Sequence, residues 1–350
     1  METKKFIDIL EIYNGKNQKS VENPDGKYPI YGSGGVMGRA DEYICPAETV
    51  VIGRKGSINN PIFVTEPFWN VDTAFGLVAR KEVLLPKYLF YFCRYFDFEK
   101  LNTTVTIPSL TKANLLKIEI PIPSIIEQKS IVTKLNLLTD MIQQRQEQLT
   151  KLDELIKARF VEMFGDPISN PFGFKVKTLQ KMIDDGTIMY HLDGNHGSDY
   201  PRNEEFVECG VPYISANCIV HNDVNLKLAK HLTEERASKL RKGIAQNGDV
   251  LFAHNATVGP VAILYTDDEK VILGTSLTAY RCDKERMVPD YLKAYMQSEG
   301  FVRQYTKDMK QTTRNQVPIT AQRKFLFVIP PLSLQNQFAD FAAEVDKSKF

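Results

Sequence analysis

The sequence predicts an α+β fold in which two β-rich domains form a pseudo-repeat and are separated by long coiled-coil helices. Short motifs recur in the same order in both halves of the chain, and the expected strands are short and bounded by Gly, Pro and Asn. One long segment with helical periodicity lies between the two copies. The 350 residues, 43% hydrophobic and 25% charged, suffice for two domains of ordinary size.

The repeat consists of four matched segments in each half. The separation of matched segments grows along the chain from 183 to 209 residues, which predicts longer loops in the second copy. We therefore expect one fold built twice. The first three pairs are 28–33 with 211–216, 48–54 with 248–254, and 85–89 with 288–292, and the fourth joins Ile120 through Gln128 to Ile329 through Gln337.

Each copy predicts the same order of elements. Short β-branched and aromatic strands come first, and a helix follows at 86–98 in the first copy and at 289–305 in the second. A proline-marked strand then leads into a Gln-containing helix at Ser124 and again at Ser333. A serine at such a position can cap the first helical turn.

Residues 124–164, between the copies, carry apolar residues at alternating steps of four and three, with arginine at the two remaining seam positions. A 3.5-residue repeat of this length predicts a coiled-coil seam, and the helix would be about 60 Å long and need a partner helix. Gly165 and Pro167 end it. The seam residues are Ile131, Leu135, Leu138, Ile142, Leu149, Leu152, Ile156 and Met163.

Composition restricts the class of protein. No apolar run approaches the roughly 18 residues of a membrane span and residues 1–11 are too charged for a signal peptide, so we expect a cytoplasmic protein with no membrane partner. The five cysteines are widely spaced without a C-x-x-C pair, which favours free thiols over disulfides or a zinc ribbon.

The net charge of +1 counts against DNA binding, which usually relies on Lys and Arg. Residues 301–324 are an exception, because they carry six basic residues against one acidic. This stretch is either a phosphate-facing surface or a solvated lysine-rich face. The basic residues are Arg303, Lys307, Lys310, Arg314, Arg323 and Lys324.

Several motifs, taken in order around the coiled-coil segment, resemble the DNA-specificity subunits of type I restriction-modification systems. The resemblance covers nearly the whole chain, and the order of the motifs is more specific than any one of them. The motifs are Met163–Pro167, Asn170–Phe174, Tyr31–Gly35, Gly53–Ser57, Ile107–Leu110, and the Ile-Pro-x-Pro strand that runs into Glu127 and Gln128.

This resemblance implies a non-catalytic subunit that reads a bipartite double-stranded DNA site for other subunits. Two target-recognition domains would each dock on one half-site, and an antiparallel helix pair would set their spacing. Methylation (M) subunits would clasp the helices and restriction (R) subunits would dock outside them. The chain itself would hold no cofactor, and S-adenosylmethionine, ATP and Mg would be bound by the partner subunits.

The resemblance also implies domain boundaries. Target-recognition domain 1 would span 1–123, the central conserved helix 124–165, target-recognition domain 2 166–331, and the start of a second conserved helix 332–350. The second helix has about 19 residues against 41 in the first, whereas the family pattern has comparable lengths. A truncated form, a natural short form, or a second molecule that supplies the packing would each account for this.

Base discrimination requires bidentate side chains on loops: Arg for guanine, Asn or Gln for adenine, and Ser or Thr more permissively. Polar loops at matching places in the two copies differ while the strands are kept, as two different DNA words would require. Drift in unconstrained loops predicts the same pattern. The candidates are Arg54, Lys55, Ser57, Asn59, Asn60, Thr103, Thr104, Thr106, Ser109, Thr111 and Lys112 in the first copy, and His254, Asn255, Thr257, Lys310, Thr312, Thr313, Arg314 and Asn315 in the second.

Catalytic and metal sites are not expected. Residues 60–63, Asn-Pro-Ile-Phe, lack the second proline of the adenine-methyltransferase motif, and no G-x-x-x-x-G-K-[ST] element is present. His191, Asp193, His196 and Asp199 imitate metal ligands but lie in a Gly-Asn-rich loop without suitable spacing.

Two alternatives remain open. The chain could be the recognition fragment of a fused restriction-methyltransferase enzyme, although the catalytic motifs of such an enzyme are missing. It could also be a coiled-coil protein-interaction scaffold, which the low net charge favours and the doubled polar loops disfavour.

Overall fold

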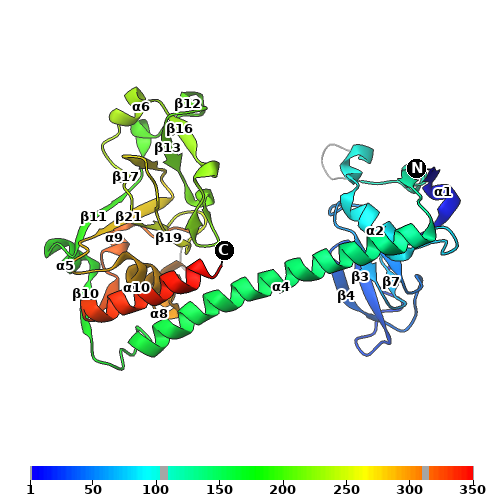
Figure 1. Cartoon of the computed structure of the whole chain (residues 1–350), viewed down its shortest axis with the longest axis horizontal. Coiled ribbons are helices and arrows are strands. Elements are labelled where there is room, and N and C mark those ends of the chain that lie inside the picture. Colours follow the sequence, from blue (N-terminus) through cyan, green and yellow to red (C-terminus); the bar gives the residue numbers. More distant parts are fainter. Residues whose placement is uncertain (1, 103–108, 310–314, 350) are drawn as a thin grey trace. The chain divides into compact units, whose positions relative to one another are not determined.

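The computed structural model describes residues 2–102, 109–309 and 315–349 and divides into two compact units, 1–146 and 147–350 (Figure 1). The division falls inside one continuous helix, α4 (Ile125–Phe164). The four domain boundaries expected from the family resemblance stay predictions.

Unit 1 contains two sheets and a ribbon. A four-stranded antiparallel sheet has the order β2-β8-β5-β6, a three-stranded sheet has the order β4-β3-β7, and β1 pairs with β9. Strand β5 is buried along its whole length. The elements are β1 (Thr3–Lys5), α1 (Phe6–Ile9), β2 (Leu10–Asn14), β3 (Tyr28–Gly32), β4 (Gly35–Ala40), β5 (Thr49–Gly53), β6 (Ile62–Val64), β7 (Trp69–Asn70), β8 (Ala74–Ala79), α2 (Pro86–Tyr95), η1 (Phe98–Leu101), α3 (Lys112–Leu115) and β9 (Glu119–Pro121).

Unit 2 has the same plan with a larger second sheet. Its four-stranded sheet has the order β11-β21-β18-β19, and its five-stranded sheet has the order β12-β16-β13-β20-β17. The elements are β10 (Lys175–Thr178), α5 (Leu179–Asp184), β11 (Ile188–Asp193), η2 (Gly197–Asp199), η3 (Asn203–Glu205), β12 (Phe206–Val207), β13 (Val211–Ile214), η4 (Ala216–Cys218), β14 (Ile219–Val220), β15 (Asp223–Val224), η5 (Leu226–Leu228), β16 (Lys230–Leu232), α6 (Glu234–Ser238), β17 (Ile244–Ala245), β18 (Val250–Ala253), β19 (Val261–Ile263), β20 (Val271–Leu273), β21 (Leu277–Cys282), α7 (Pro289–Gln297), α8 (Glu299–Met309), α9 (Ile319–Gln322), β22 (Leu326–Ile329) and α10 (Leu332–Lys347).

The topology confirms the predicted α+β pseudo-repeat. In each four-stranded sheet the strand that comes first in the sequence, β2 or β11, pairs with the one that comes last, β8 or β21. The other two strands, β5 and β6 or β18 and β19, complete the sheet in that order. In each second sheet one pair is parallel, β3 with β7 and β13 with β20. Strand β22 pairs with β10 as β9 pairs with β1. The two units are therefore two copies of one fold.

The structure corrects the register of the fourth matched segment. Lys5 pairs with Glu119, and its counterpart Thr178 pairs with Leu326, so this part of the repeat is separated by 207 residues rather than 209. The helix glutamine Gln128 therefore corresponds to the buried Gln335, whereas Gln337 is exposed.

Two expected helix features also differ. The expected helix at 289–305 is two helices, α7 and α8, because Ser298 has an extended backbone and its hydroxyl oxygen accepts from Phe301 N–H at 3.3 Å. Ser124 caps α4 as expected, in a reciprocal pair with Glu127. Ser333 does not cap α10, since that helix begins at Leu332 after Pro331.

Helix α10 packs against the last turns of α4 within unit 2 (Figure 1). The ring of Phe338 lies 5.6 Å from that of Phe160, and Lys349 pairs with Asp153 at 2.6 Å, so the two helices run antiparallel.

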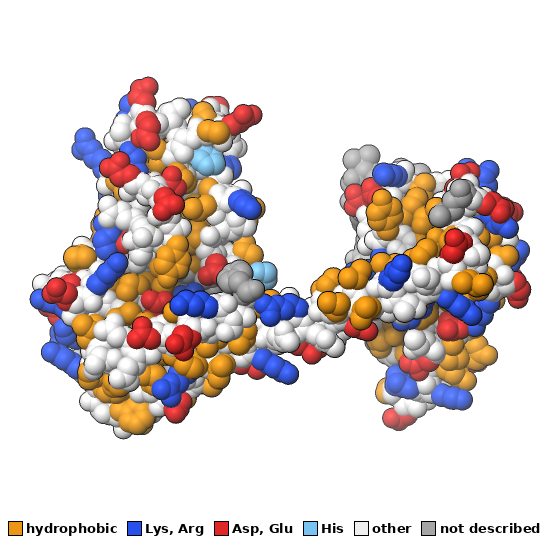
Figure 2. All heavy atoms as spheres, viewed as in Figure 1, with side chains coloured by type: hydrophobic (Ala, Val, Ile, Leu, Met, Phe, Trp, Pro, Cys, Tyr) orange, Lys and Arg blue, Asp and Glu red, His pale blue; other side chains and the backbone are white. Residues whose placement is uncertain are grey.

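The seam residues of α4 differ in burial. Leu138 and Ile142 are 53% and 71% exposed. Hydrophobic side chains gather on the stretch of α4 that belongs to unit 1 (Figure 2). The half-buried seam residues are Ile131, Leu135, Leu149, Leu152, Ile156 and Met163.

Candidate nucleic-acid interface

The loop after β5 presents polar side chains in the first repeat. Arg54 is tied through its backbone, because its N–H donates to Thr73 O at 2.7 Å and its carbonyl accepts from Leu110 N–H at 2.9 Å. The buried Ile58 anchors the middle of the loop. The candidates Arg54, Lys55, Ser57, Asn59 and Asn60 are all exposed around this anchor.

The corresponding loop after β18 has a different surface. His254 is buried, Asn255 is half-buried, and Thr257 is exposed. Both loops bend through a left-handed backbone at the same place, with Gly56 at φ 77° and Ala256 at φ 64°. The bend is therefore common to both repeats, although only the first places a glycine there.

In each repeat the structure brings the two predicted polar loops together. Lys55 forms an isolated β-bridge with Ser109, and Asn255 forms one with Gln316. Ala256 N–H also donates to the carbonyl of the exposed Asn315 at 3.1 Å. The predicted candidates that lie outside the described residues are Thr103, Thr104, Thr106, Lys310, Thr312, Thr313 and Arg314.

Three candidates in the first repeat have partners within the fold. Asn59 accepts from Phe98 N–H at 2.7 Å and donates to Asp97 at 3.1 Å. The Lys112 ammonium donates to the Ile12 carbonyl at 2.7 Å, and Thr111 caps α3. These contacts give the side chains structural roles at the edge of the interface.

Sequence reasoning missed a buried polar cluster beneath the second loop. Gln322 is fully buried; its carbonyl oxygen accepts from Tyr280 at 2.7 Å, and its amide donates to Thr278 at 3.1 Å and to Val317 O at 3.0 Å. His191 Nε2 lies 3.2 Å from the same Gln322 oxygen. No sequence signal pointed to the cluster, because only the strand pairing sets the register that matches Gln322 to Leu115.

The two histidines of this region are held neutral. Burial lowers the pKa of His191 to about 4, and burial also lowers the pKa of His254. His254 Nδ1 lies 3.2 Å from the Val317 carbonyl, which can only accept, so Nδ1 carries the proton. His254 Nε2 and His191 Nδ1 are buried with no hydrogen-bond partner among the described residues.

The surface charge is mixed. Figure 2 shows basic and acidic side chains interspersed over the visible described face of each unit. Within the basic stretch, Arg303 pairs with Glu299 at 3.0 Å, whereas Arg323 and Lys324 are exposed. The side chains of residues 307–309 and all of residues 310–314 lie outside the described residues.

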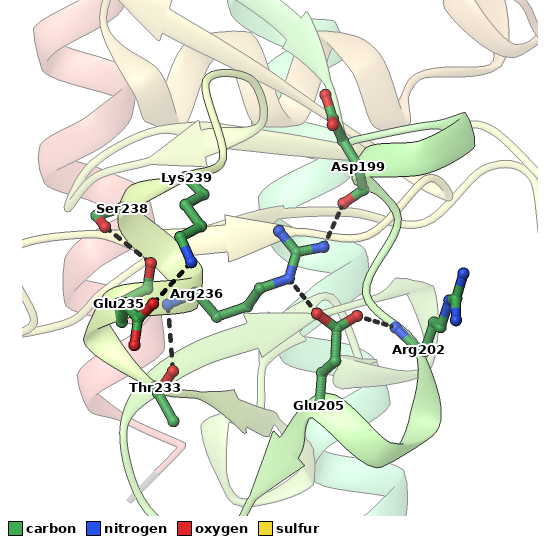
Figure 3. Close-up of polar contacts among 8 residues, drawn as sticks. All are labelled: Asp199, Arg202, Glu205, Thr233, Glu235, Arg236, Ser238 and Lys239. Atoms are coloured by element: carbon green, nitrogen blue, oxygen red, sulfur yellow. Dashed lines mark hydrogen bonds and ion pairs between the residues drawn. The ribbon is translucent and has the colours of Figure 1, made fainter.

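Basic residues around the five-stranded sheet of unit 2 are bound by acidic neighbours. Figure 3 shows Arg236 of α6 reaching Glu205, and the Arg236 guanidinium also donates to Asp199 O at 3.1 Å. Lys239 pairs with Glu235 at 2.7 Å. The Arg236 contacts connect α6 to residues 199 and 205, and both pairs leave less basic charge for a phosphate backbone.

Among the described residues, no group of three or more His, Cys, Asp or Glu is arranged to hold a metal ion. Nor does any helix of the described chain have the length and apolar character to cross a membrane. All five cysteines are free thiols, as the sequence predicts, and Cys209 is the exposed one.

Comparisons with known proteins agree with this architecture. The model of the type I restriction modification DNA specificity domain matches residues 1–152. The chain is 21% identical to the MjaVIII type I restriction enzyme specificity subunit of Methanocaldococcus jannaschii, with 97% of this chain and 84% of that protein covered.

Two solved structures share the fold. The S subunit of a type I restriction-modification system from M. genitalium has a TM-score of 0.60 at 16% identity and covers 99% of this chain, with 90% of its own length matched. A chain from a structure on assembly and conformational transition of a type I system has a TM-score of 0.51 at 16% identity, with 99% and 90% covered. Residues 1–152 are therefore similar to the type I restriction modification DNA specificity domain, and almost the whole chain is similar to a type I restriction enzyme specificity subunit.

Proposed function

We propose that the chain recognises a bipartite DNA site and directs separate methylation and restriction subunits to it, without catalysing a reaction itself. The observation that carries this proposal is that the two repeats present different side chains at one structural position. Arg54 and Lys55 are exposed in the first repeat, where the second has a buried His254 and a half-buried Asn255. Two different surfaces on one scaffold suit two different DNA words.

The helix α4 would serve as the spacer in this proposal, because it is continuous from the end of the first repeat into the second. Bases between the two words would be passed over, since no loop would reach their edges. S-adenosylmethionine, ATP and Mg would be held by the partner subunits. Because its ligand would be the DNA of the cell, we also propose that the protein acts in the cytoplasm.

The decisive experiment is to co-express the chain with its methylation subunit and to map adenine methylation across a genome by single-molecule sequencing. We expect methylation at a split motif, two short words separated by a fixed gap. An assembled complex that methylates no split motif would refute the proposal and favour the interaction scaffold.

The salt dependence of binding separates the two functions independently. Lys and Arg contacts to phosphates release counterions, so a DNA reader loses affinity steeply with added salt. Replacing Arg54 and Lys55 together by alanine should reduce the slope of log affinity against log salt by about 1 to 2. The double variant Lys239→Ala, Glu235→Ala is the matched control, because it removes a pair that is already neutralised.

A further inference from the structure

Four buried positions near the loops after β5 and β18 carry apolar side chains in the first repeat and polar side chains in the second. The strand registers match Ile12 to His191 and Leu77 to Tyr280, and they match Phe75 to Thr278. The last residue of α3, Leu115, corresponds to Gln322 at the end of α9. All eight side chains are at most 6% exposed. The first repeat thus has an apolar core where the second has a polar cluster.

The polar cluster is a connected network with a defined orientation. The Val317 carbonyl can only accept, so the Gln322 amide nitrogen must face it and the Gln322 oxygen must face Tyr280 and His191. His191 therefore donates through Nε2, and its ring also packs edge-on against Tyr280 at 4.7 Å. One glutamine joins strand β11, strand β21 and the segment 315–317.

This network ends on the residues that form the candidate interface. Val317 O accepts from both Gln322, at 3.0 Å, and His254 Nδ1, at 3.2 Å. The Val317 N–H in turn donates to the His254 carbonyl at 2.8 Å. In the first repeat the matching Leu110 keeps the backbone bond to Arg54, but the side chain at the position of Gln322 is Leu115, which has no polar group to add.

We propose that Gln322 is a positioning residue for DNA recognition by the second repeat: it fixes the segment 315–317 against His254, and so sets which bases the adjoining loops can contact. The proposal rests on the proposed function of the chain. The second repeat has a buried polar network under its loop that the first repeat lacks. Recognition of the two DNA words should therefore respond differently to the same kind of core substitution.

The test is Gln322→Leu, which installs the residue of the first repeat, in the complex with the methylation subunit. Motif mapping by single-molecule sequencing should show one word relaxed, with discrimination against single-base changes in it reduced on the order of tenfold. The other word should be unchanged. Arg54→Ala should relax the opposite word, which assigns each word to its repeat.

A cavity control separates positioning from stability. Leu292→Ala in α7 removes a fully buried apolar side chain that can make no hydrogen bond to the network, and it should lower methylation without changing either word. If Gln322→Leu behaves like this control, with both words intact, the proposal is wrong. A wild-type complex that yields no split motif would instead refute the proposed function.

The variant Gln322→Glu provides a second test, the pH dependence of discrimination. This dependence is not expected if Gln322 serves only to fill space in the core. A buried carboxyl group resists ionisation and can donate to the Val317 carbonyl only while protonated. Discrimination in the affected word should therefore improve as pH falls from 8 toward 6 in Gln322→Glu, and stay constant in Gln322→Leu. Equal pH profiles for the two variants would overturn the assignment. The comparison remains valid if Gln322→Leu assembles poorly, because it uses the change of discrimination with pH and not the amount of complex.

Discussion

The side-chain oxygen of Gln335 accepts a hydrogen bond from the backbone N–H of Val288 at 2.9 Å, immediately before α7 begins. The Gln335 amide donates to Pro330 O at 2.9 Å. Gln128 makes the same two bonds in the first repeat, to Leu85 N–H at 2.9 Å and to Pro123 O at 3.0 Å. One buried glutamine thus joins each repeat to the helix that follows it.

Gln335→Leu should therefore destabilise unit 2 strongly. The substitution leaves a buried N–H and a buried carbonyl without partners, at a cost of about 2 to 4 kcal/mol. Gln337→Leu, on an exposed position two residues later, should change the free energy of unfolding by less than about 0.5 kcal/mol. Urea unfolding of the chain measures both, and equal effects would contradict the corrected register.

The free energy of unfolding should decrease as the pH is lowered, because His191 stays neutral in the folded state. Its pKa is lowered to about 4, against about 6.5 in an unfolded chain, so the unfolded state binds a proton first as the pH decreases. This stability is fully present above pH 6.5 and is lost toward pH 4, by up to about 3 kcal/mol. His191→Ile should flatten the profile of urea midpoints against pH, and a profile as steep as that of the wild type would contradict this assignment.

Adjacent asparagines in the first reading loop should behave differently. Asn59→Ala removes the acceptor of Phe98 N–H and should cost unit 1 about 1 kcal/mol of stability. Asn60→Ala should leave stability unchanged and weaken DNA binding, by about 1 to 3 kcal/mol if Asn60 contacts a base. Thermal unfolding and DNA titration of the two variants decide this, and a loss of stability in Asn60→Ala would count against it.

The exposed seam of α4 predicts a partner surface. Ile142 is 71% exposed, so Ile142→Asp should not change unfolding of the isolated chain. It should prevent co-elution with the methylation subunit, because a charge in an apolar helix interface is costly. Gln144→Asp adds the same charge at an exposed polar position and should co-elute normally. Co-elution of both variants would remove this face from the interface.

Periodicity and turn residues predicted the larger features of the fold, since buried strands and a heptad seam leave regular patterns in the sequence. They did not locate Ser298, where one hydroxyl cap divides a helix in two. They also matched Gln128 to Gln337, because a short Pro- and Gln-rich segment aligns equally well at two offsets. Only the pairing of Thr178 with Leu326 separates the two offsets.

The candidate interface was less predictable than the fold. Exposed polar residues such as Lys55 and Thr257 follow from strand ends and turns. The hydrogen bond of Asn59 requires Phe98, which is distant along the chain. The hydrogen bonds of Gln322 likewise require Tyr280 and Val317. Sequence patterns register local order, whereas these roles arise from contacts made after folding.

The polar cluster around Gln322 also constrains how this protein can have diverged from its own duplicated half. Changing any one of the four apolar core residues to its polar counterpart would leave a buried donor or acceptor without a hydrogen-bond partner. Changing one of the four polar residues to its apolar counterpart would do the same. Intermediate sequences would fold less well than either end state. Residues 191, 278, 280 and 322 should therefore be inherited as a set, and lineages that differ at one of them should differ at the others.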